Sequence, residues 1–306
     1  MSNKESPVTR LIKSCDIYHK ITTEYDTKSS SSNLINLITI VLIFMLCLSE
    51  FSTYWNPEFI SDLQVDLSTE SESKITINID IDLPKVPCHI ISVDVEDVIG
   101  SHIVDFEGDL KKRIMDKNGR ILEILDAKER THNSKEVLEK TKEGIEKNMG
   151  CNLKGSIIVN KINGNFHISS HAYTEAVMTL YSNQKMLDFT HKINHLSFGA
   201  EDHIAKITKL TGGYNLSPLD KIGESIHPQN LGNHFHNTHT TYYLDIMATK
   251  YYIGTEEQYS AHEYTYSFQT VTTHGMPAIF VKFELSPLFI NYKVSQNLFF
   301  VFFIRC

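Results

Sequence analysis

The stretch KITINIDIDL, at residues 74–83, decides the fold class of this 306-residue chain. Its apolar residues alternate with polar ones; they are Ile75, Ile77, Ile79, Ile81 and Leu83. Side chains of a β-strand point alternately to its two faces, so a period of two predicts a strand with one buried and one polar face. Pro84 and Pro87 follow closely and end the strand.

Similar stretches recur along the rest of the chain. We expect strands at residues 89–98, 104–110, 120–125, 156–160, 166–169, 240–252, 264–273, 278–285 and 288–294. Asn163 and Gly164 form a two-residue turn signal, which predicts a hairpin. Residues 126–147 are rich in Lys and Glu and predict an exposed helix or a mobile insertion. Many short strands with few helices predict a mainly β fold, an antiparallel β-sandwich.

An uncharged stretch, SSSSNLINLITIVLIFMLCLS, occupies residues 29–49 near the N-terminus. A helix of this length spans about 30 Å, the thickness of the hydrocarbon core of a bilayer. We therefore expect residues 29–51 to form a transmembrane helix. A buried helix of a soluble protein is one alternative. A cleaved signal peptide is another, but the stretch begins late in the chain and no small-residue cleavage site follows it.

The charges that flank this stretch predict its orientation. Basic residues precede it, whereas acidic residues follow it and no base occurs before Lys74. Basic flanks stay on the cytosolic side, so we expect residues 1–28 to be a cytosolic tail and residues 52–296 to form a luminal domain. Residues 297–306 contain the apolar run LFFVFFI, for which a strand, an apolar tail and the start of a second transmembrane helix are the alternatives.

The expected luminal location bears on two modifications. Of the five cysteines, only Cys88 and Cys151 fall in the luminal part. An oxidising lumen favours their pairing, so we predict a Cys88–Cys151 disulfide, with a pair of buried thiols as the alternative. Asn215 begins a glycosylation sequon, although Pro218 follows it and is expected to lower its use.

Composition and motifs exclude several classes of function. The net charge of −8 argues against nucleic acid as a partner. The sequence contains no Gly-x-Ser-x-Gly, no Cys-x-x-Cys and no glycine-rich phosphate loop. Nothing in the chain requires an enzyme or a cofactor.

Histidines are the remaining candidates for chemistry. His234, His236 and His239 occur as HFHNTH, for which a loop without a ligand, a pH-responsive patch and a metal site are the alternatives. No Asp, Glu or Cys completes a metal site close by in the sequence. His191 and His195 are four residues apart without the Glu of a zinc-protease motif, which favours structural roles.

Four ordered segments resemble the endoplasmic reticulum vesicle transporter family, the membrane proteins of the ER–Golgi intermediate compartment (ERGIC). The segments are VNKINGNFH at 159–167, THKINHLSFG at 190–199, NLSPLD at 215–220 and MPAIFVKFELSPL at 276–288. The matching residues include Asn160, Lys161, Gly164, Asn165, Phe166, His167, His191, His195, Leu196, Ser197, Phe198, Gly199, Ser286 and Pro287. Their roles are structural or partner-binding. Because the chain lacks a cysteine-rich insertion, it most resembles the smallest member type.

The resemblance implies a topology. Family members have two transmembrane helices, both ends in the cytosol and a large β-rich luminal domain, which favours reading residues 297–306 as the start of a second transmembrane helix. The remainder of that helix and the cytosolic tail that binds vesicle coats are not in this sequence, which puts direct coat recognition in doubt. The expected location is the membrane of the ER, the ERGIC and the cis-Golgi.

The resemblance also implies a function. We expect a non-enzymatic protein of ER–Golgi vesicle transport, cycling in coated vesicles, whose luminal domain binds cargo or related family subunits. Histidine titration between the near-neutral ER and the more acidic Golgi is a hypothesis for release or capture. The alternatives are a secretory-pathway enzyme acting on glycans and a structural subunit that stabilises a larger family member.

Overall fold

The structure is a computed structural model, and it describes residues 30–55, 58–65, 74–98, 100, 102–103, 106–129, 133–183, 187–220, 237–253, 257–273 and 275–295. The chain divides into two compact units. One is Met1–Glu58 with Gln296–Cys306, and the other, which we call the β module, is Phe59–Ser295. The expected cytosolic tail at 1–28 and the expected helix start at 297–306 lie outside the described residues.

The first unit contains helix α2, Ser30–Trp55. Its apolar side chains are exposed, with Phe44 at 62% and Leu46 at 66% of their full accessible surface. Cys47, on the same helix, is an exposed free thiol. A search confined to the described residues finds no helix that is long and apolar enough to cross a membrane.

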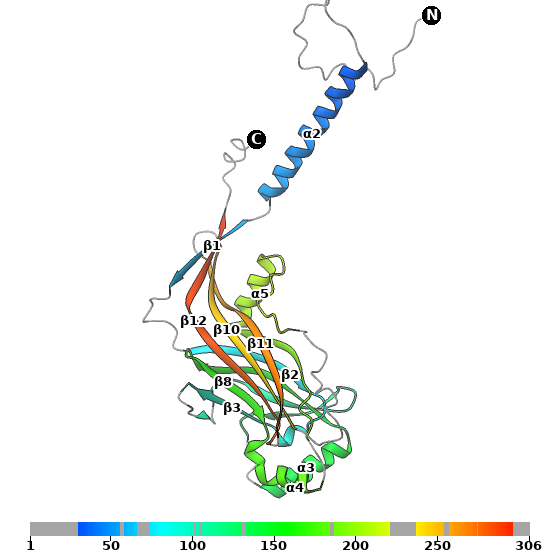
Figure 1. The fold of residues 1–306 in the computed structure, drawn as a ribbon, viewed down its shortest axis with the longest axis vertical. Coiled ribbons are helices and arrows are strands. Elements are labelled where there is room, and N and C mark those ends of the chain that lie inside the picture. The colour runs from blue at the N-terminus through cyan, green and yellow to red at the C-terminus, as the bar shows by residue number, and fades with distance from the viewer. Residues whose placement is uncertain are drawn as a thin grey trace, which may run out of the picture. The chain divides into compact units, whose positions relative to one another are not determined.

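The β module is built on one twelve-stranded sheet that curls around its core (Figure 1). The strands are β1 (Glu58–Val65), β2 (Lys74–Leu83), β3 (Ser92–Asp97), β4 (His102–Ile103), β5 (Leu110–Met115), β6 (Ile121–Asp126), β7 (Gly150–Asn160), β8 (Gly164–Ser169), β9 (Lys192–Phe198), β10 (Asn237–Ile253), β11 (Glu257–Thr273) and β12 (Ala278–Ser295). Their order is β4-β3-β8-β12-β10-β11-β9-β2-β7-β5-β6, and β1 pairs with β12 outside this path.

The alternation along β2 explains its central place in the sheet. Ile75, Ile77, Ile79, Ile81 and Leu83 are all buried, with at most 4% of their surface exposed. They join one core with apolar residues of distant strands, including Leu153 of β7, Phe198 of β9 and Phe283 of β12. Burial of the apolar side chains of these distant strands in one core is the main contribution to the stability of the β module. The prediction of a mainly β, sandwich-like fold is confirmed.

The prediction of an entirely antiparallel sheet is wrong for one pair of strands. β10 and β11 are antiparallel, but β12 pairs with β10 in parallel, from His239 opposite Ala278 to Tyr252 opposite Lys293. The other edge of β11 contacts β9. After β11 the chain reverses direction again. β12 therefore runs in the same direction as β10 and pairs with the edge of β10 that β11 leaves free.

The two strands expected at 278–285 and 288–294 are one strand, β12. Pro287 cannot donate a ladder hydrogen bond, and the register of the β10–β12 pair shifts between Ile246 and Ala248, beside Ser286 and Pro287. The Leu288 amide donates to the Ser286 hydroxyl at 3.1 Å. A β-bulge thus absorbs the proline without ending the strand.

The hairpin expected at Asn163 and Gly164 does not form. β7 pairs with β2 and β5, whereas β8 pairs with β3 and β12. Gly164 is required for another reason, because a Cβ atom there would lie 2.8 Å from the carbonyl oxygen of Glu96 on β3. The glycine allows the two strands to approach closely.

The strand expected at 104–110 is also displaced, since β5 begins at Leu110. Glu107 already pairs with Ile158 of β7 as an isolated bridge, and Gly108, with φ of 121°, and Gly155, with φ of 140°, interrupt the ladder between that bridge and β5. A Cβ atom on Gly155 would lie 1.9 Å from the Asp109 carbonyl oxygen. β5 itself was missed because its sequence is basic; Lys112 is nevertheless buried and donates to the Ile91 carbonyl at 2.7 Å.

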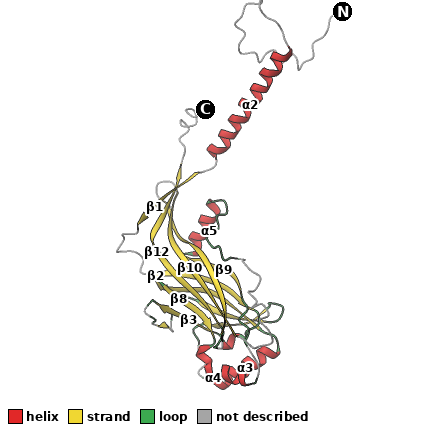
Figure 2. Cartoon of the chain, viewed as in Figure 1, coloured by secondary structure: helices red, strands yellow, loops and turns green. Residues whose placement is uncertain are grey.

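The described residues of the β module also form three α-helices, namely α3 (Ser134–Glu146), α4 (Thr174–Ser182) and α5 (Glu201–Leu210). The first two lie together at one end of the sheet (Figure 2). Asn133 caps α3, accepting from the backbone amides of residues 135 and 136. Three of the thirteen residues of α3, Val137, Thr141 and Gly144, are buried, and the others are half-buried or exposed. Within the charged stretch 126–147, the helix is therefore the correct alternative.

The predicted disulfide is present. Cys88 begins a short 3-10 helix, Cys88–Ile90, and is bonded to Cys151 near the start of β7. The two residues are 63 positions apart in the sequence, and neither is exposed. The bond ties the chain entering β3 to β7, which lies between β2 and β5.

Candidate functional site

The polar face of β2 carries a hydrogen-bonded cluster. Asn152 donates to one carboxylate oxygen each of Asp80 and Asp82, both at 2.7 Å. Asn194 donates to the same two carboxylates at 3.3 and 2.7 Å. Burial raises the pKa of Asp80, but the ion pair with Lys154 and the two amides outweigh it and lower that pKa. Asp80 is therefore held ionised, and both carboxylates accept hydrogen bonds from the same two amides.

A second chain of hydrogen bonds joins two of the family-like segments. His195 Nδ1 lies 2.5 Å from the Asp220 carboxylate, and its Nε2 lies 2.9 Å from the Ser197 hydroxyl. The other Asp220 oxygen accepts from the Leu196 amide at 2.9 Å. Asn78 on β2 donates to the Ser197 hydroxyl at 3.0 Å. The segments 190–199 and 215–220 thus meet through side chains.

This arrangement has the connectivity of a Ser-His-Asp triad, but its environment is not that of a catalytic site. The Ser197 residue is only 1% exposed, and its hydroxyl already contacts Asn78 and His195. A catalytic serine must reach a substrate carbonyl. The hydrogen bonds instead fix β9 to β2 and to the segment around Asp220.

The Asp220 carboxylate raises the pKa of His195. A group whose pKa is raised by folding stabilises the fold fully below its unfolded pKa, and this contribution is lost as the pH rises through the folded value. We expect Asp220→Asn to lower the free energy of unfolding by about 1 kcal/mol more at pH 6 than at pH 8.5, since the pair is partly exposed.

Denaturant unfolding of the full chain in detergent at the two pH values measures this difference. Asp188→Asn is the matched control, because Asp188 forms its ion pair with a lysine, Lys85, and not with a histidine. An equal loss of stability at both pH values for Asp220→Asn would show that the His195 pair is energetically silent.

His191 has both ring nitrogens engaged inside the fold. Its Nδ1 donates to the Phe189 carbonyl at 2.9 Å, and its Nε2 accepts from the Tyr242 hydroxyl at 2.9 Å. Burial lowers the pKa of His191, which keeps the ring neutral. The residue therefore fixes the approach to β9 rather than facing a ligand.

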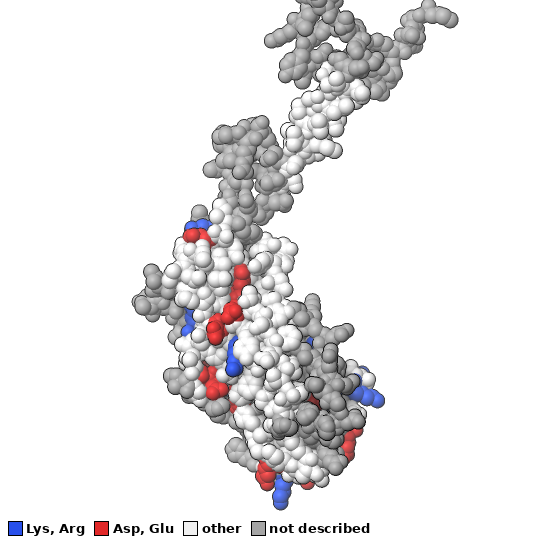
Figure 3. Space-filling model, in the orientation of Figure 1, with Lys and Arg blue, Asp and Glu red and all other residues white. Residues whose placement is uncertain are grey.

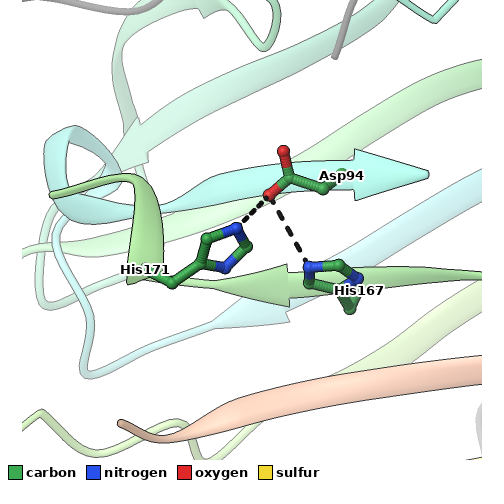
Figure 4. A group of neighbouring side chains, drawn as sticks. All are labelled: Asp94, His167 and His171. Carbon is green, nitrogen blue, oxygen red and sulfur yellow. Dashed lines mark ion pairs between the residues drawn. The ribbon is translucent and has the colours of Figure 1, made fainter. Parts of the chain in front are cut away.

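A third group lies on β3 and β8, where Asp94, His167 and His171 converge (Figure 4). The Asp94 carboxylate oxygen is 3.8 Å from Nε2 of His167 and 3.4 Å from Nε2 of His171. Asp94 and His167 are buried, whereas 42% of the His171 side chain is exposed. His167 belongs to a family-like segment, but Asp94 and His171 were not among the candidate residues.

The other candidate residues are spread over the β module. Phe166 and Phe198 are buried in the core, and Lys161 lies between β7 and β8. Gly199 has φ of 117°, and its carbonyl accepts from Asn78 at 2.9 Å. His234 and His236 lie outside the described residues, while His239 contacts the Met276 carbonyl at 2.5 Å.

Asn160 ends β7 and is exposed, while Asn165 donates to Glu96 at 3.3 Å. Asn215 is also exposed, and it accepts a hydrogen bond from the Ser217 amide. In the view of Figure 3 the charged side chains among the described residues are scattered, without a broad basic patch.

Comparison with protein-family models gives two matches. Residues 123–306 match the model described as "Endoplasmic reticulum vesicle transporter". Residues 12–104 match the model described as "Endoplasmic Reticulum-Golgi Intermediate Compartment (ERGIC)". Together the two matched ranges contain all four family-like segments, helix α2 and both cysteines of the disulfide.

Relatives of similar length carry names of the same kind. The chain is 26% identical over 300 residues to "Endoplasmic reticulum-Golgi intermediate compartment protein 1" of Danio rerio, covering 95% of this chain and 86% of that protein. It is 26% identical to the Homo sapiens "Endoplasmic reticulum-Golgi intermediate compartment protein 2", covering 96% of this chain and 81% of that protein. The crystal structure of Erv41p matches with a TM-score of 0.51 at 20% identity, covering 77% of this chain and 100% of that chain, which shows a shared fold.

Proposed function

This chain belongs to the endoplasmic reticulum vesicle transporter family, and from that premise we propose that it is a non-enzymatic membrane protein of ER–Golgi vesicle transport that binds related family subunits and luminal cargo. Its relatives are named for the ER–Golgi intermediate compartment. The observation that carries the proposal is the family match over residues 123–306, which comprises most of the β module. The same names support a location in ER and Golgi membranes.

The proposed topology has residues 1–28 in the cytosol, residues 29–51 across the membrane and residues 52–296 in the lumen. The exposed apolar side chains of α2 support an anchoring role. The Cys88–Cys151 disulfide supports a luminal β module, because disulfides persist in the oxidising secretory compartments. The basic N-terminal flank supports the orientation.

The outer edge of β6 is the surface that we propose for a related family subunit. Among the described strands, β6 ends the sheet and pairs only with β5. Its residues Ile121, Leu122 and Ile124 are 45%, 52% and 57% exposed. An edge strand with exposed apolar side chains offers both backbone hydrogen bonds and apolar area to a partner strand.

The test is co-purification from cells that produce the tagged full chain together with a differently tagged member of the same family. We expect the two proteins to co-purify and to enter the same ER-derived vesicles. Leu122→Lys should reduce co-purification about tenfold, because it places a charge in the proposed interface. Leu210→Lys on α5 is the matched control, since Leu210 is 44% exposed away from this edge.

Failure of either protein to enter ER-derived vesicles would overturn the proposed function. If the pair enters vesicles but Leu122→Lys and Leu210→Lys co-purify equally, the assignment of the β6 edge is wrong. If loss of this chain removes the second subunit from the cell without changing the luminal proteins in the vesicles, the chain acts as a stabilising subunit and cargo binding is contradicted.

A further inference from the structure

The group formed by Asp94, His167 and His171 has the composition of a transition-metal site. One carboxylate oxygen and two imidazole nitrogens lie within 4.8 Å of one another. Asp94 is opposite His167 in the β3–β8 register, and His171 begins the short 3-10 helix, His171–Tyr173, that follows β8. Within the described residues, no second set of three His, Cys, Asp or Glu side chains meets in this way.

The hydrogen bonds behind the two rings orient them. Asn165 donates through its amide nitrogen to Glu96, so its amide oxygen faces His167 Nδ1 at 3.4 Å and accepts the proton of that nitrogen. The Ser169 hydroxyl is hydrogen-bonded to His171 Nδ1. In both rings Nε2 is therefore the nitrogen that faces the carboxylate (Figure 4). Such support of the remote ring nitrogen is usual for metal-binding histidines.

We propose that Asp94, His167 and His171 bind one Zn²⁺ ion. Zinc bonds of about 2.0–2.2 Å to nitrogen and oxygen put tetrahedral ligands roughly 3.3–3.5 Å apart. The Asp94–His171 distance of 3.4 Å lies in this range. The Asp94–His167 distance of 3.8 Å is longer, and the three ligand atoms span up to 4.8 Å, so the side chains must close around the ion when it binds. Two imidazoles and one carboxylate are ligands that zinc accepts, and they leave a fourth position for water or an outside ligand.

Burial and access both suit such an ion. Asp94 and His167 are 2% and 4% exposed, so a cation between them is shielded from water. The His171 side chain is 42% exposed, which provides an entry path.

Titration of the metal-free full chain in detergent tests the proposal. Co²⁺ is the spectroscopic probe, because tetrahedral Co²⁺ absorbs visible light, and competition with Zn²⁺ gives the zinc affinity. We expect one metal ion per chain. We also expect an X-ray absorption spectrum that shows two imidazole ligands on the metal. His171→Gln should weaken metal binding at least tenfold. Even loss of a residue that only hydrogen-bonds to a metal ligand reduces metal affinity by about 10–100-fold.

His171→Gln is the decisive variant because its exposed side chain is not needed for the core. Zn²⁺ should raise the melting temperature of the parent chain and not that of His171→Gln, as binding to the folded state stabilises it. His203→Gln is the matched control, since His203 contacts the Ser260 carbonyl on another part of the module. No stoichiometric binding, or equal affinity in the parent and His171→Gln, would overturn the proposal. An equal loss of zinc affinity in His171→Gln and His203→Gln would show only binding to surface histidines and would overturn the proposal as well.

Discussion

Replacing both disulfide cysteines, Cys88→Ala with Cys151→Ala, should lower the free energy of unfolding of the β module by about 4 kcal/mol. The bond closes a loop between residues 63 positions apart, so it removes much conformational freedom from the unfolded chain. Both cysteines are fully buried, and Cys151 lies opposite Leu83 and Ile114 in the register of β7 with β2 and β5. Loss of the two sulfur atoms adds a small packing defect in the core beside β7.

Pulse proteolysis of the full chain in detergent, over a series of urea concentrations, measures this loss. Cys47→Ala is the matched control, because Cys47 is an exposed thiol on α2 outside the β module. The control should unfold like the parent chain. A loss below about 1 kcal/mol in the double variant would mean that the unfolded chain is already constrained without the bond, and that the disulfide is not a main support of the module.

The sequence predicts most of the β module where the signal is local. The alternation in residues 74–83 identifies β2 because each apolar side chain on one face is buried in the core. β10 and β11 are also recovered, since long stretches of aromatic and β-branched residues favour strands. The turn residues Asp, Asn and Gly at 116–119 are a local signal of the same kind, and the Gly119 amide donates to the Asp116 carbonyl there.

Pairing between strands depends on residues that are far apart in the sequence. Several of the wrong predictions concern this pairing. Asn163 and Gly164 carry a hairpin signal, yet β7 lies between β2 and β5, whereas β8 lies between β3 and β12. The basic residues of β5 hid a strand whose Lys112 is buried on a backbone carbonyl. Helix α5 had a usable signal, because Glu201 and Asp202 open a segment with apolar residues spaced at 204 and 207.

The candidate sites show the same difference between what a local sequence signal predicts and what depends on strand pairing. Family resemblance identified His195 and the segment around Asp220, but only the fold shows that their side chains meet. Asp94 and His171 were missed because the register of β3 with β8, which no local pattern fixes, brings them to His167. The spacing of His167 and His171 was the one available clue, and it needed the acidic residue of a neighbouring strand to become informative.

The central claim is that the β module lies in the lumen behind an N-terminal anchor. The full chain, with an epitope tag at residue 1, is inserted into sealed microsomes and treated with a protease before and after detergent is added. A luminal module is shielded by the membrane. We therefore expect the protease to leave the module intact before detergent is added and to digest all of it afterwards. A fragment that retains the Cys88–Cys151 disulfide marks the module on non-reducing gels.

Protease protection in these sealed microsomes is the most direct measurement of that claim. The account predicts that the tag is removed at once, while a disulfide-bearing fragment that contains residues 59–295 survives until detergent opens the membrane. Digestion of this fragment in intact microsomes, with the N-terminal tag spared, would contradict the proposed orientation and with it the binding of luminal cargo.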